Sequence, residues 1–183
     1  MRNFLRIAHG VDTAPVLLEL VRNADLWDEH RTRKTYAGTP HAEMSDIWVR
    51  FRPQREIEGL ASHQEEYRCE FYDAWRRLPS LRPLVAAIKA RVDAVELGSI
   101  LITRLPPHAA ILQHTDGGAW APTFYNCKAH VTLSGSSRSN CAGEEVTMAQ
   151  GDVWTFDNLL EHGVHNPGDT DRIALIISMR CEP

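Results

Sequence analysis

The spacing of hydrophobic residues changes about halfway along the chain. In the first half, apolar residues recur every three or four positions, the period of a helix that buries one face. The remaining segments there are polar, apart from one short run rich in apolar residues that ends before Pro53 and predicts a strand. We therefore expect a largely helical N-terminal half, with helices over 13–27, 56–77 and 81–95, a polar connection over 31–43 and a strand over 46–51.

The first of these helices has the clearest start. Thr13 stands at the capping position and Pro15 falls in the first turn, where the missing amide hydrogen of proline removes no helical hydrogen bond. The polar connection contains Gly38 and Pro40, which interrupt regular structure. The helices are expected to form a scaffold that packs against a sheet.

The second half consists of short β-rich runs separated by turn residues. Pro106 and Pro107 separate the first two runs, and the sequence Gln-Gly-Asp at 150–152 predicts a hairpin connection. Closely spaced strands of this kind favour a sandwich or a closed double sheet. The expected fold is mainly β with N-terminal helices (α+β) around a double-stranded β-helix, a jelly-roll core of the cupin type, with strands over 99–105, 109–114, 124–133, 144–148, 153–156 and 172–179.

Composition limits the size and the surroundings of this fold. A chain of 183 residues, 43% of them apolar, fills one core, so we expect a single domain over 1–183, with 1–96 as scaffold and 97–183 as jelly roll. The net charge of -4 gives no reason to expect a nucleic-acid or anionic-membrane partner. There is no membrane-spanning apolar run and no signal-like N-terminus, and the four cysteines form no CxxC pair. We expect a cytoplasmic protein with reduced thiols; no sequence feature sets its oligomeric state.

Candidate metal ligands occur in two separate clusters. His114 and Asp116 end an apolar strand two residues apart, so their side chains share one face. His162 follows the strand over 153–156 and supplies a second imidazole. Two histidines and one carboxylate leave the opposite positions of a metal open, as in non-haem iron(II) oxygenases. His165 is an alternative third ligand, but the Glu-His-Gly-Val context and the spacing to Arg172 favour His162.

Arg172 adds a candidate anion-binding group. It stands ten residues after His162 and begins the final apolar strand. A guanidinium group can hold a carboxylate through two parallel hydrogen bonds, which a lysine does less specifically. Arg172 therefore fits a dicarboxylate co-substrate beside the predicted metal.

Together these residues give the sequence a recognisable pattern. The segments LITRLPPHAAILQHTD, NCKAHVTLSG, GDVWTFDNLLEHGVHN and DRIALIISM, within 100–179, resemble the aspartyl/asparaginyl β-hydroxylase family of 2-oxoglutarate oxygenases. The resemblance implies Fe(II) as metal, 2-oxoglutarate as co-substrate, and hydroxylation by dioxygen coupled to decarboxylation to succinate. It implies that His114 and His162 bind iron and that Arg172 binds the distal carboxylate of 2-oxoglutarate.

The resemblance is not complete at every position. His130 stands where the family commonly has an arginine, Thr132 where it commonly has a histidine, and Thr103 where a serine is often found. These three residues are supporting candidates for contact with 2-oxoglutarate. Asp116 completes a triad that the best-known animal members lack. Because related halogenases carry glycine or alanine at this position, Asp116 favours hydroxylation.

Three further residues are candidates for substrate binding. Arg50 and Trp48 lie on the predicted strand of the N-terminal half, where the arginine offers a cation to a substrate carboxylate. Trp120 follows Asp116 in a glycine-containing loop that suits a lid. The large animal hydroxylases act with a helical-repeat region that has no counterpart here. We therefore expect a free amino acid, a short peptide or another small metabolite as substrate.

Two other classes of function fit parts of the same pattern. A cupin-like metalloprotein would use the ligands for zinc or manganese in isomerisation, hydrolysis or sensing, and would have no need of a dicarboxylate at Arg172. A small-molecule binding module would carry only the remnant of a metal site, so that loss of His114 would leave ligand binding unchanged. Both alternatives predict that 2-oxoglutarate does not chelate a bound metal.

Overall fold

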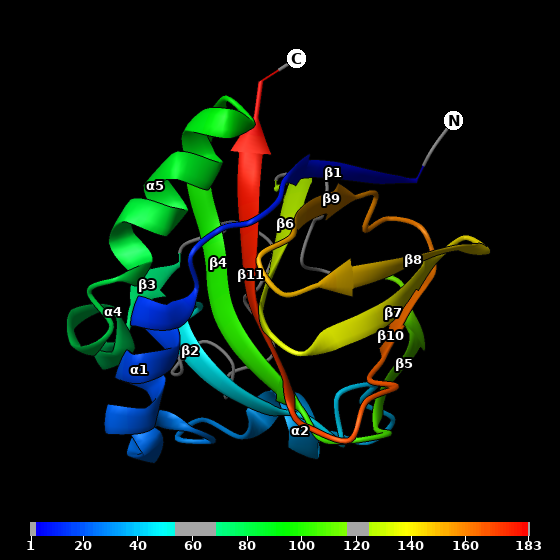
Figure 1. Cartoon of the computed structure of the whole chain (residues 1–183), viewed down its shortest axis with the longest axis horizontal. Helices are drawn as coiled ribbons and strands as arrows, with labels where there is room; N and C mark the ends of the chain where they lie inside the picture. The colour runs from blue at the N-terminus through cyan, green and yellow to red at the C-terminus, as the bar shows by residue number, and fades with distance from the viewer. Residues whose placement is uncertain (1–2, 54–68, 117–124, 183) are drawn as a thin grey trace.

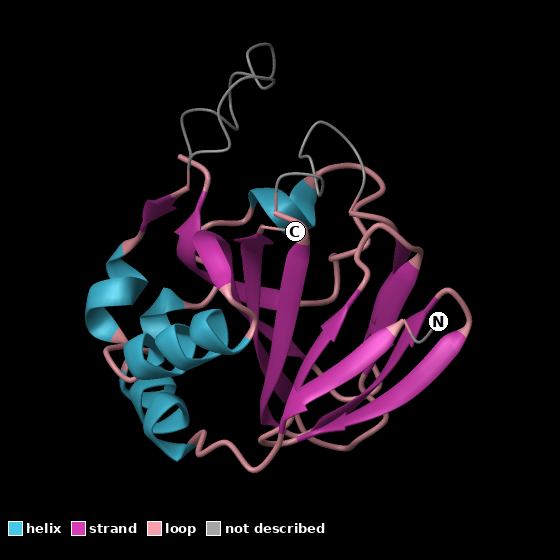
Figure 2. Cartoon of the chain, turned by 90° about the horizontal axis from the view of Figure 1, so that it is seen from above, coloured by secondary structure: helices cyan, strands magenta, loops and turns pink. Residues whose placement is uncertain are grey.

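Two antiparallel sheets face each other, and helices cover the outer side of the larger one (Figures 1 and 2). The computed structural model describes residues 3–53, 69–116 and 125–182. The helical elements are α1 (Ala14–Arg22), η1 (Ala24–Leu26), α2 (Thr32–Thr35), α4 (Asp73–Arg77) and α5 (Leu81–Arg91). The strands are β1 (Phe4–Ala8), β2 (Ser45–Phe51), β3 (Glu70–Phe71), β4 (Ala94–Leu105), β5 (Ala110–His114), β6 (Cys127–Ser134), β7 (Ser136–Cys141), β8 (Glu144–Ala149), β9 (Val153–Phe156), β10 (His162–His165) and β11 (Arg172–Cys181).

The strand order confirms the expected jelly-roll class. The larger sheet runs β1-β9-β6-β11-β4-β2-β3 and the smaller one β5-β10-β7-β8, with antiparallel pairing throughout the described strands. Strands that are neighbours in a sheet are mostly distant in sequence, as in a Greek-key path. None of the described helices is long and apolar enough to cross a membrane.

The N-terminal helices are shorter than their hydrophobic pattern predicts. The helix expected over 13–27 is regular only in α1, because Asn23 turns its side chain back to the carbonyl of Glu19 at 2.8 Å and a short 3-10 turn follows. Thr13 is the N-cap residue but makes no side-chain capping bond. Instead the carboxylate of Asp12 accepts the amide hydrogen of Ala14 at 3.0 Å.

The second and third predicted helices are only partly correct. Most of 56–77 lies outside the described residues, and its described end is the strand β3 followed by the single turn α4 rather than one helix. The helix expected over 81–95 ends at Arg91, because Asp93 adopts a positive φ of 53° and the chain enters β4 at Ala94. The polar segment 31–43 contains the short helix α2, which the sequence did not predict.

All the predicted strands are present, but β1, β3, β7 and β10 were missed. β7 has the polar sequence SSRSNC and resembles a solvated turn, yet Ser137 and Ser139 are buried. Pairing with β8 on one side and β10 on the other satisfies its backbone, so a polar strand is stable there. β1 comes from the part expected to be helical and pairs with β9.

Alternation along β11 separates the hydrophobic core from the interior of the jelly roll. Leu175, Ile177 and Met179 are fully buried and pack with the helices. Arg172 and Ala174 alternate with them and therefore point to the space between the two sheets. The same alternation on β4 and β6 sends Thr103, His130 and Thr132 into the interior, where all three are buried. The residues that it sends to the helix-covered core are Ile100, Ile102, Ala129, Val131 and Leu133.

Asn166 closes the loop between β10 and β11. Its side-chain amide donates to the carbonyls of Leu105, Pro106 and Thr170 at 3.0, 2.9 and 2.8 Å, and its oxygen accepts the amide hydrogen of Gly168 at 3.1 Å. The residue is 1% exposed, so water does not replace these bonds. We expect Asn166 to fix the start of β11, where Arg172 lies.

We predict that Asn166→Ala lowers the free energy of unfolding by about 2–3 kcal/mol, because buried carbonyl groups lose their donor. Urea denaturation measures the change. The matched control is His165→Ala, at the exposed neighbouring position, with an expected change within about 0.5 kcal/mol. Equal effects of the two substitutions would contradict the role assigned to Asn166.

Candidate metal centre

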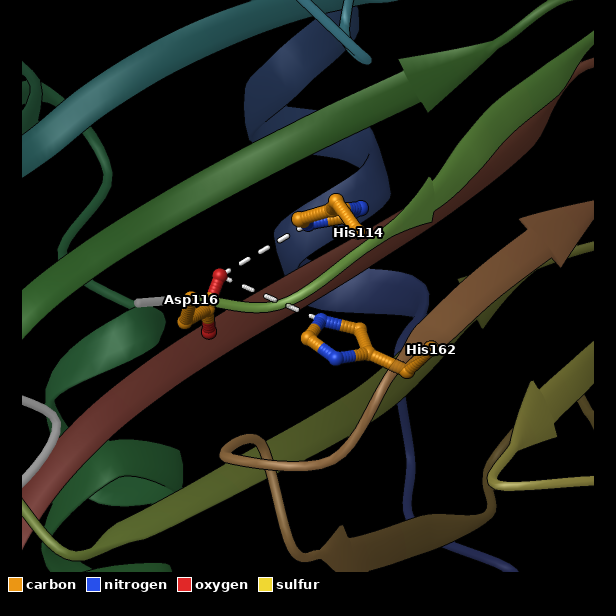
Figure 3. Close-up of side chains that lie close together, drawn as sticks. All are labelled: His114, Asp116 and His162. Atoms are coloured by element: carbon orange, nitrogen blue, oxygen red, sulfur yellow. Dashed lines mark ion pairs between the residues drawn. The ribbon is translucent and has the colours of Figure 1, made fainter. Parts of the chain in front are cut away.

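Three side chains converge where β5 meets β10 (Figure 3). His114 ends β5, His162 begins β10, and the antiparallel register places these two residues opposite each other. Asp116 follows two residues after His114, and its Oδ1 lies 3.6 Å from Nε2 of His114 and 3.9 Å from Nε2 of His162. One ligand atom from each residue lies within 4.8 Å of the other two, which is a spacing that a single metal ion can bridge.

A glycine allows the two strands that carry His114 and His162 to approach closely. A Cβ atom at Gly163 would lie 3.1 Å from the carbonyl oxygen of Ile111 and 3.1 Å from the side-chain carbon of Gln113. The register also shifts between His162 and Val164, which indicates a local irregularity of the kind often found beside functional sites. Gly163 thus helps to bring the two imidazoles to the same point.

Backbone carbonyls orient both imidazoles. Nδ1 of His114 donates to the carbonyl of Leu112 at 2.7 Å, and Nδ1 of His162 donates to the carbonyl of Leu160 at 2.9 Å. In each ring the hydrogen then sits on Nδ1 and the lone pair of Nε2 faces Asp116. Burial lowers the pKa of His162, which favours the neutral form that metals bind.

Asp116 presents its two oxygens to different partners. Oδ2 forms an ion pair with Lys128 and accepts a hydrogen bond from Nδ2 of Asn158 at 3.2 Å, while Oδ1 faces the two histidines. The amide of Asp116 also donates to the carbonyl of Asn158 at 3.3 Å. Burial raises the pKa of Asp116, but the charge of Lys128 outweighs it and holds this pKa far below the usual range. A charged carboxylate with one oxygen directed at the histidines can act as a monodentate ligand.

Arg172 lies in the interior without a carboxylate partner among the described residues. The residue is 0% exposed, Nη1 is 3.4 Å from Oγ1 of Thr103, and Nε and Nη2 have no hydrogen-bond partner. Burial lowers its pKa to about 10, still well above neutrality, so the group remains cationic. A buried charge without a counter-ion is unfavourable, and a bound carboxylate would satisfy it.

Two predicted neighbours of Arg172 also carry unsatisfied polar atoms. Oγ1 of Thr132 and Nδ1 of His130 are buried without a partner. Thr132 and Thr103 pair with Ala174 from either side of β11, so they lie in one row across the sheet. Burial, reinforced by the charge of Arg172, holds the pKa of His130 well below its usual value, so its imidazole is neutral. These buried atoms fit a polar ligand better than an apolar core.

The structure places the remaining predicted residues elsewhere. Trp48 is 2% exposed, stacks on His30 with ring centroids 4.7 Å apart and donates from Nε1 to Asp46 at 3.3 Å. Nη1 of Arg50 donates to the carbonyls of Leu97 and Gly98. Trp120 lies outside the described residues. His165, the alternative ligand, is exposed at the other end of β10 and does not belong to the three-residue group.

Four residues near the centre were not identified from the sequence. A cavity of about 240 Å³ borders Asp116, and Arg33, His41, Lys128 and Asn158 are among the residues that line it. The ring of His41 lies 5.1 Å from that of His114, and burial lowers the pKa of His41 to about 2. Lys128 stands two residues before His130 on one strand, so alternation alone places it on the same face. Arg33 and His41 come from the polar segment 31–43, which carries no comparable signal.

Solved structures with a similar fold include two prolyl hydroxylases and another oxygenase. A prolyl hydroxylase from Trichoplax adhaerens, in complex with a peptide fragment, is 10% identical with a TM-score of 0.66, covering 97% of this chain and 83% of that one. A prolyl-4-hydroxylase from Pseudomonas putida is 16% identical with a TM-score of 0.55, covering 100% and 95%. A 2-oxoglutarate and Fe(II) oxygenase-family oxidoreductase from Burkholderia pseudomallei is 14% identical, with a TM-score of 0.53 and coverage of 75% and 66%. At these identities the likeness concerns the fold.

The sequence itself defines the family. Residues 26–181 match the aspartyl/asparaginyl β-hydroxylase family, while no curated protein matches the chain. The fold and the family together make the protein an enzyme of the 2-oxoglutarate-dependent hydroxylase class. The chain belongs to the aspartyl/asparaginyl β-hydroxylase family, which confirms the resemblance seen in the sequence.

We predict that Asn158→Ala weakens the binding of Mn(II) or Co(II) about 10-fold, because Asp116 loses a hydrogen bond that holds Oδ2 away from the histidines. Calorimetric titration of the purified protein measures this. Leu159→Ala, at a neighbouring residue that is 52% exposed, is the control and should leave the dissociation constant unchanged. Unchanged metal binding in Asn158→Ala would show that Lys128 alone suffices to orient Asp116.

Proposed function

We propose that the protein is an Fe(II) and 2-oxoglutarate dependent dioxygenase that hydroxylates an unactivated C–H bond of an amino acid, a peptide residue or a related small metabolite. His114, Asp116 and His162 would hold the iron, and Arg172 would hold the distal carboxylate of 2-oxoglutarate. Bound together, iron and 2-oxoglutarate supply the oxidation by dioxygen, with release of succinate and carbon dioxide. The observation on which the proposal depends is the buried Arg172, which has no carboxylate partner in the described structure. Its side chain lies in the interior between the sheets, as do the three candidate ligands.

Each residue of the centre has a defined task in this proposal. The carbonyls of Leu112 and Leu160 keep the Nε2 lone pairs of His114 and His162 directed at one point. Lys128 and Asn158 occupy one oxygen of Asp116 and leave the other for the metal. The three ligands occupy one side of that point, so the opposite side stays available for a chelating co-substrate.

Binding of the distal carboxylate of 2-oxoglutarate would depend on one cation. Arg172 supplies the charge, and the hydroxyl groups of Thr103 and Thr132 flank it along the sheet. His130 replaces an arginine that is common in the family, and because its imidazole is neutral it contributes a hydrogen bond rather than a second charge. Arg172 is buried without a counter-ion among the described residues. This favours a function that binds a dicarboxylate over that of a zinc or manganese protein that binds none.

We predict that the protein with Fe(II) and 2-oxoglutarate, kept free of oxygen, shows the weak visible charge-transfer band of a chelated 2-oxo acid. His162→Ala should abolish the band because one ligand is lost. His165→Ala, the matched control at the exposed alternative position, should retain it. Admission of oxygen should then yield succinate. Absence of the band in a protein that binds zinc or manganese tightly would favour the cupin-like alternative.

We predict opposite effects of Arg172→Met on binding and on stability. Loss of the guanidinium should weaken 2-oxoglutarate binding about 100-fold, measured by titration of the same band. The metal-free variant should be as stable as the parent or more stable by about 1–3 kcal/mol in urea, because an apolar side chain of similar length replaces a buried charge without a counter-ion. A strongly destabilised variant with normal 2-oxoglutarate affinity would identify Arg172 as a structural residue.

A further inference from the structure

The strand that carries His114 lies at the edge of its sheet. In the order β5-β10-β7-β8, β10 is the one described strand that pairs with β5. His114 is the last residue of β5, and its side chain is 17% exposed, against 7% for that of His162. A ligand at the end of an edge strand has few neighbours within the sheet, so its position depends on support from other parts of the chain.

The polar segment that precedes β2 supplies contacts on the open side of β5. The amide of Leu112 donates to the carbonyl of Pro40 at 3.2 Å, and the amide of Ala110 donates to a carboxylate oxygen of Glu43 at 2.9 Å. Leu112 is also the residue whose carbonyl orients the ring of His114. The polar segment therefore takes part of the place of a neighbouring strand, next to the group that orients the ligand.

His41 of the same segment contacts the candidate ligand directly. Its ring is nearly perpendicular to that of His114, with an interplanar angle of 82° and ring centroids 5.1 Å apart. The ring of His162 also contacts that of His114, with centroids 4.4 Å apart. The imidazole of His114 thus packs against two other imidazoles, one from the second candidate ligand and one from His41.

Arg33 ties His41 to the larger sheet. Its Nη2 lies 3.4 Å from Nε2 of His41, and its Nη1 forms an ion pair at 2.7 Å with Asp46, a residue of β2 that is 2% exposed. A guanidinium group donates hydrogen bonds and accepts none, so Nε2 of His41 is the acceptor. The buried ion pair holds Arg33, and Arg33 holds the ring of His41 against His114. A ligand of the smaller sheet is therefore braced from the larger one.

We propose that His41 is a positioning residue for the metal centre, which holds the imidazole of His114 in the orientation that binds the ion. The inference rests on the proposed function, because it takes His114 as a ligand, and it adds a residue from outside the ligand set. His41 acts through its ring contact with His114 and needs no contact with the ion. Residues that orient a ligand in this way commonly contribute about 10–100-fold to metal affinity.

The test measures metal binding rather than turnover. Co(II) is titrated calorimetrically into the purified metal-free protein, and the visible absorption spectrum of the complex reports the geometry of the ligands. We expect His41→Ala to weaken Co(II) binding about 10-fold and to change the spectrum, because the ring of His114 loses its support. His41→Phe keeps an aromatic ring at this position, so it should restore both the affinity and the spectrum to near those of the parent.

His30→Ala is the matched control for a purely structural role. The ring of His30 also packs against aromatic side chains, 4.7 Å from Trp48 and 4.8 Å from Tyr72, but none of its described ring contacts is with a candidate ligand. Its loss should lower the urea midpoint and leave the Co(II) affinity and spectrum unchanged. Normal affinity and spectrum in His41→Ala overturn the proposal. So do a His41→Phe variant as deficient as His41→Ala, a His30→Ala variant that impairs the site equally, and a parent protein that binds no Co(II).

The failure of this inference is distinguishable from failure of the proposed function. A parent protein that forms the charge-transfer band, together with a His41→Ala variant that binds Co(II) normally, refutes the positioning role and leaves the oxygenase function intact. A Co(II) site that depends on His41, in protein that forms no band with Fe(II) and 2-oxoglutarate, supports the positioning role and refutes the oxygenase function.

Discussion

The antiparallel pairing of β5 with β10 is the interaction on which the candidate site depends. It sets His114 opposite His162, and Asp116 follows two residues after the end of β5 and reaches the same point. A shift of register by one residue would turn His162 to the other face of the sheet and separate it from His114 and Asp116. Gly163 permits the close approach of the two strands, so the sheet itself positions the two histidines.

A second constraint is the division of β11 into two faces. Its aliphatic face joins the core that packs against the helices, and this burial stabilises the fold. Its other face carries Arg172, whose desolvated charge works against stability. Residues that reduce stability in this way are expected at functional sites, since selection retains them for binding. The unsatisfied atoms of His130 and Thr132 follow the same logic.

Sequence periodicity predicted the parts of the fold that depend on local pattern. The strands and the jelly-roll class were predicted from short β-rich runs separated by turn residues. The expectation that His114 and Asp116 share a face came from alternation with period two. β7 and β10 were missed because tertiary pairing, not composition, makes them strands: one is polar and the other has only four residues. Helix ends were misplaced where single residues such as Asn23 and Asp93 redirect the chain.

The sequence predicted those site residues that share a strand or a motif with one another. His162 and Arg172 stand out through their spacing, whereas Arg33 and His41 reach the cavity from a polar segment whose path depends on long-range packing. The orientation of Asp116 by Lys128 and Asn158 likewise joins three distant segments. Contacts of this kind have no local signature in the sequence.

The most direct test of the account is an oxygen-free crystal structure with Mn(II) and 2-oxoglutarate. The account predicts metal bonds to Nε2 of His114, Nε2 of His162 and Oδ1 of Asp116, and a carboxylate of 2-oxoglutarate paired with the guanidinium of Arg172. A metal held by other residues, or a co-substrate whose carboxylates both lie away from Arg172, would contradict it.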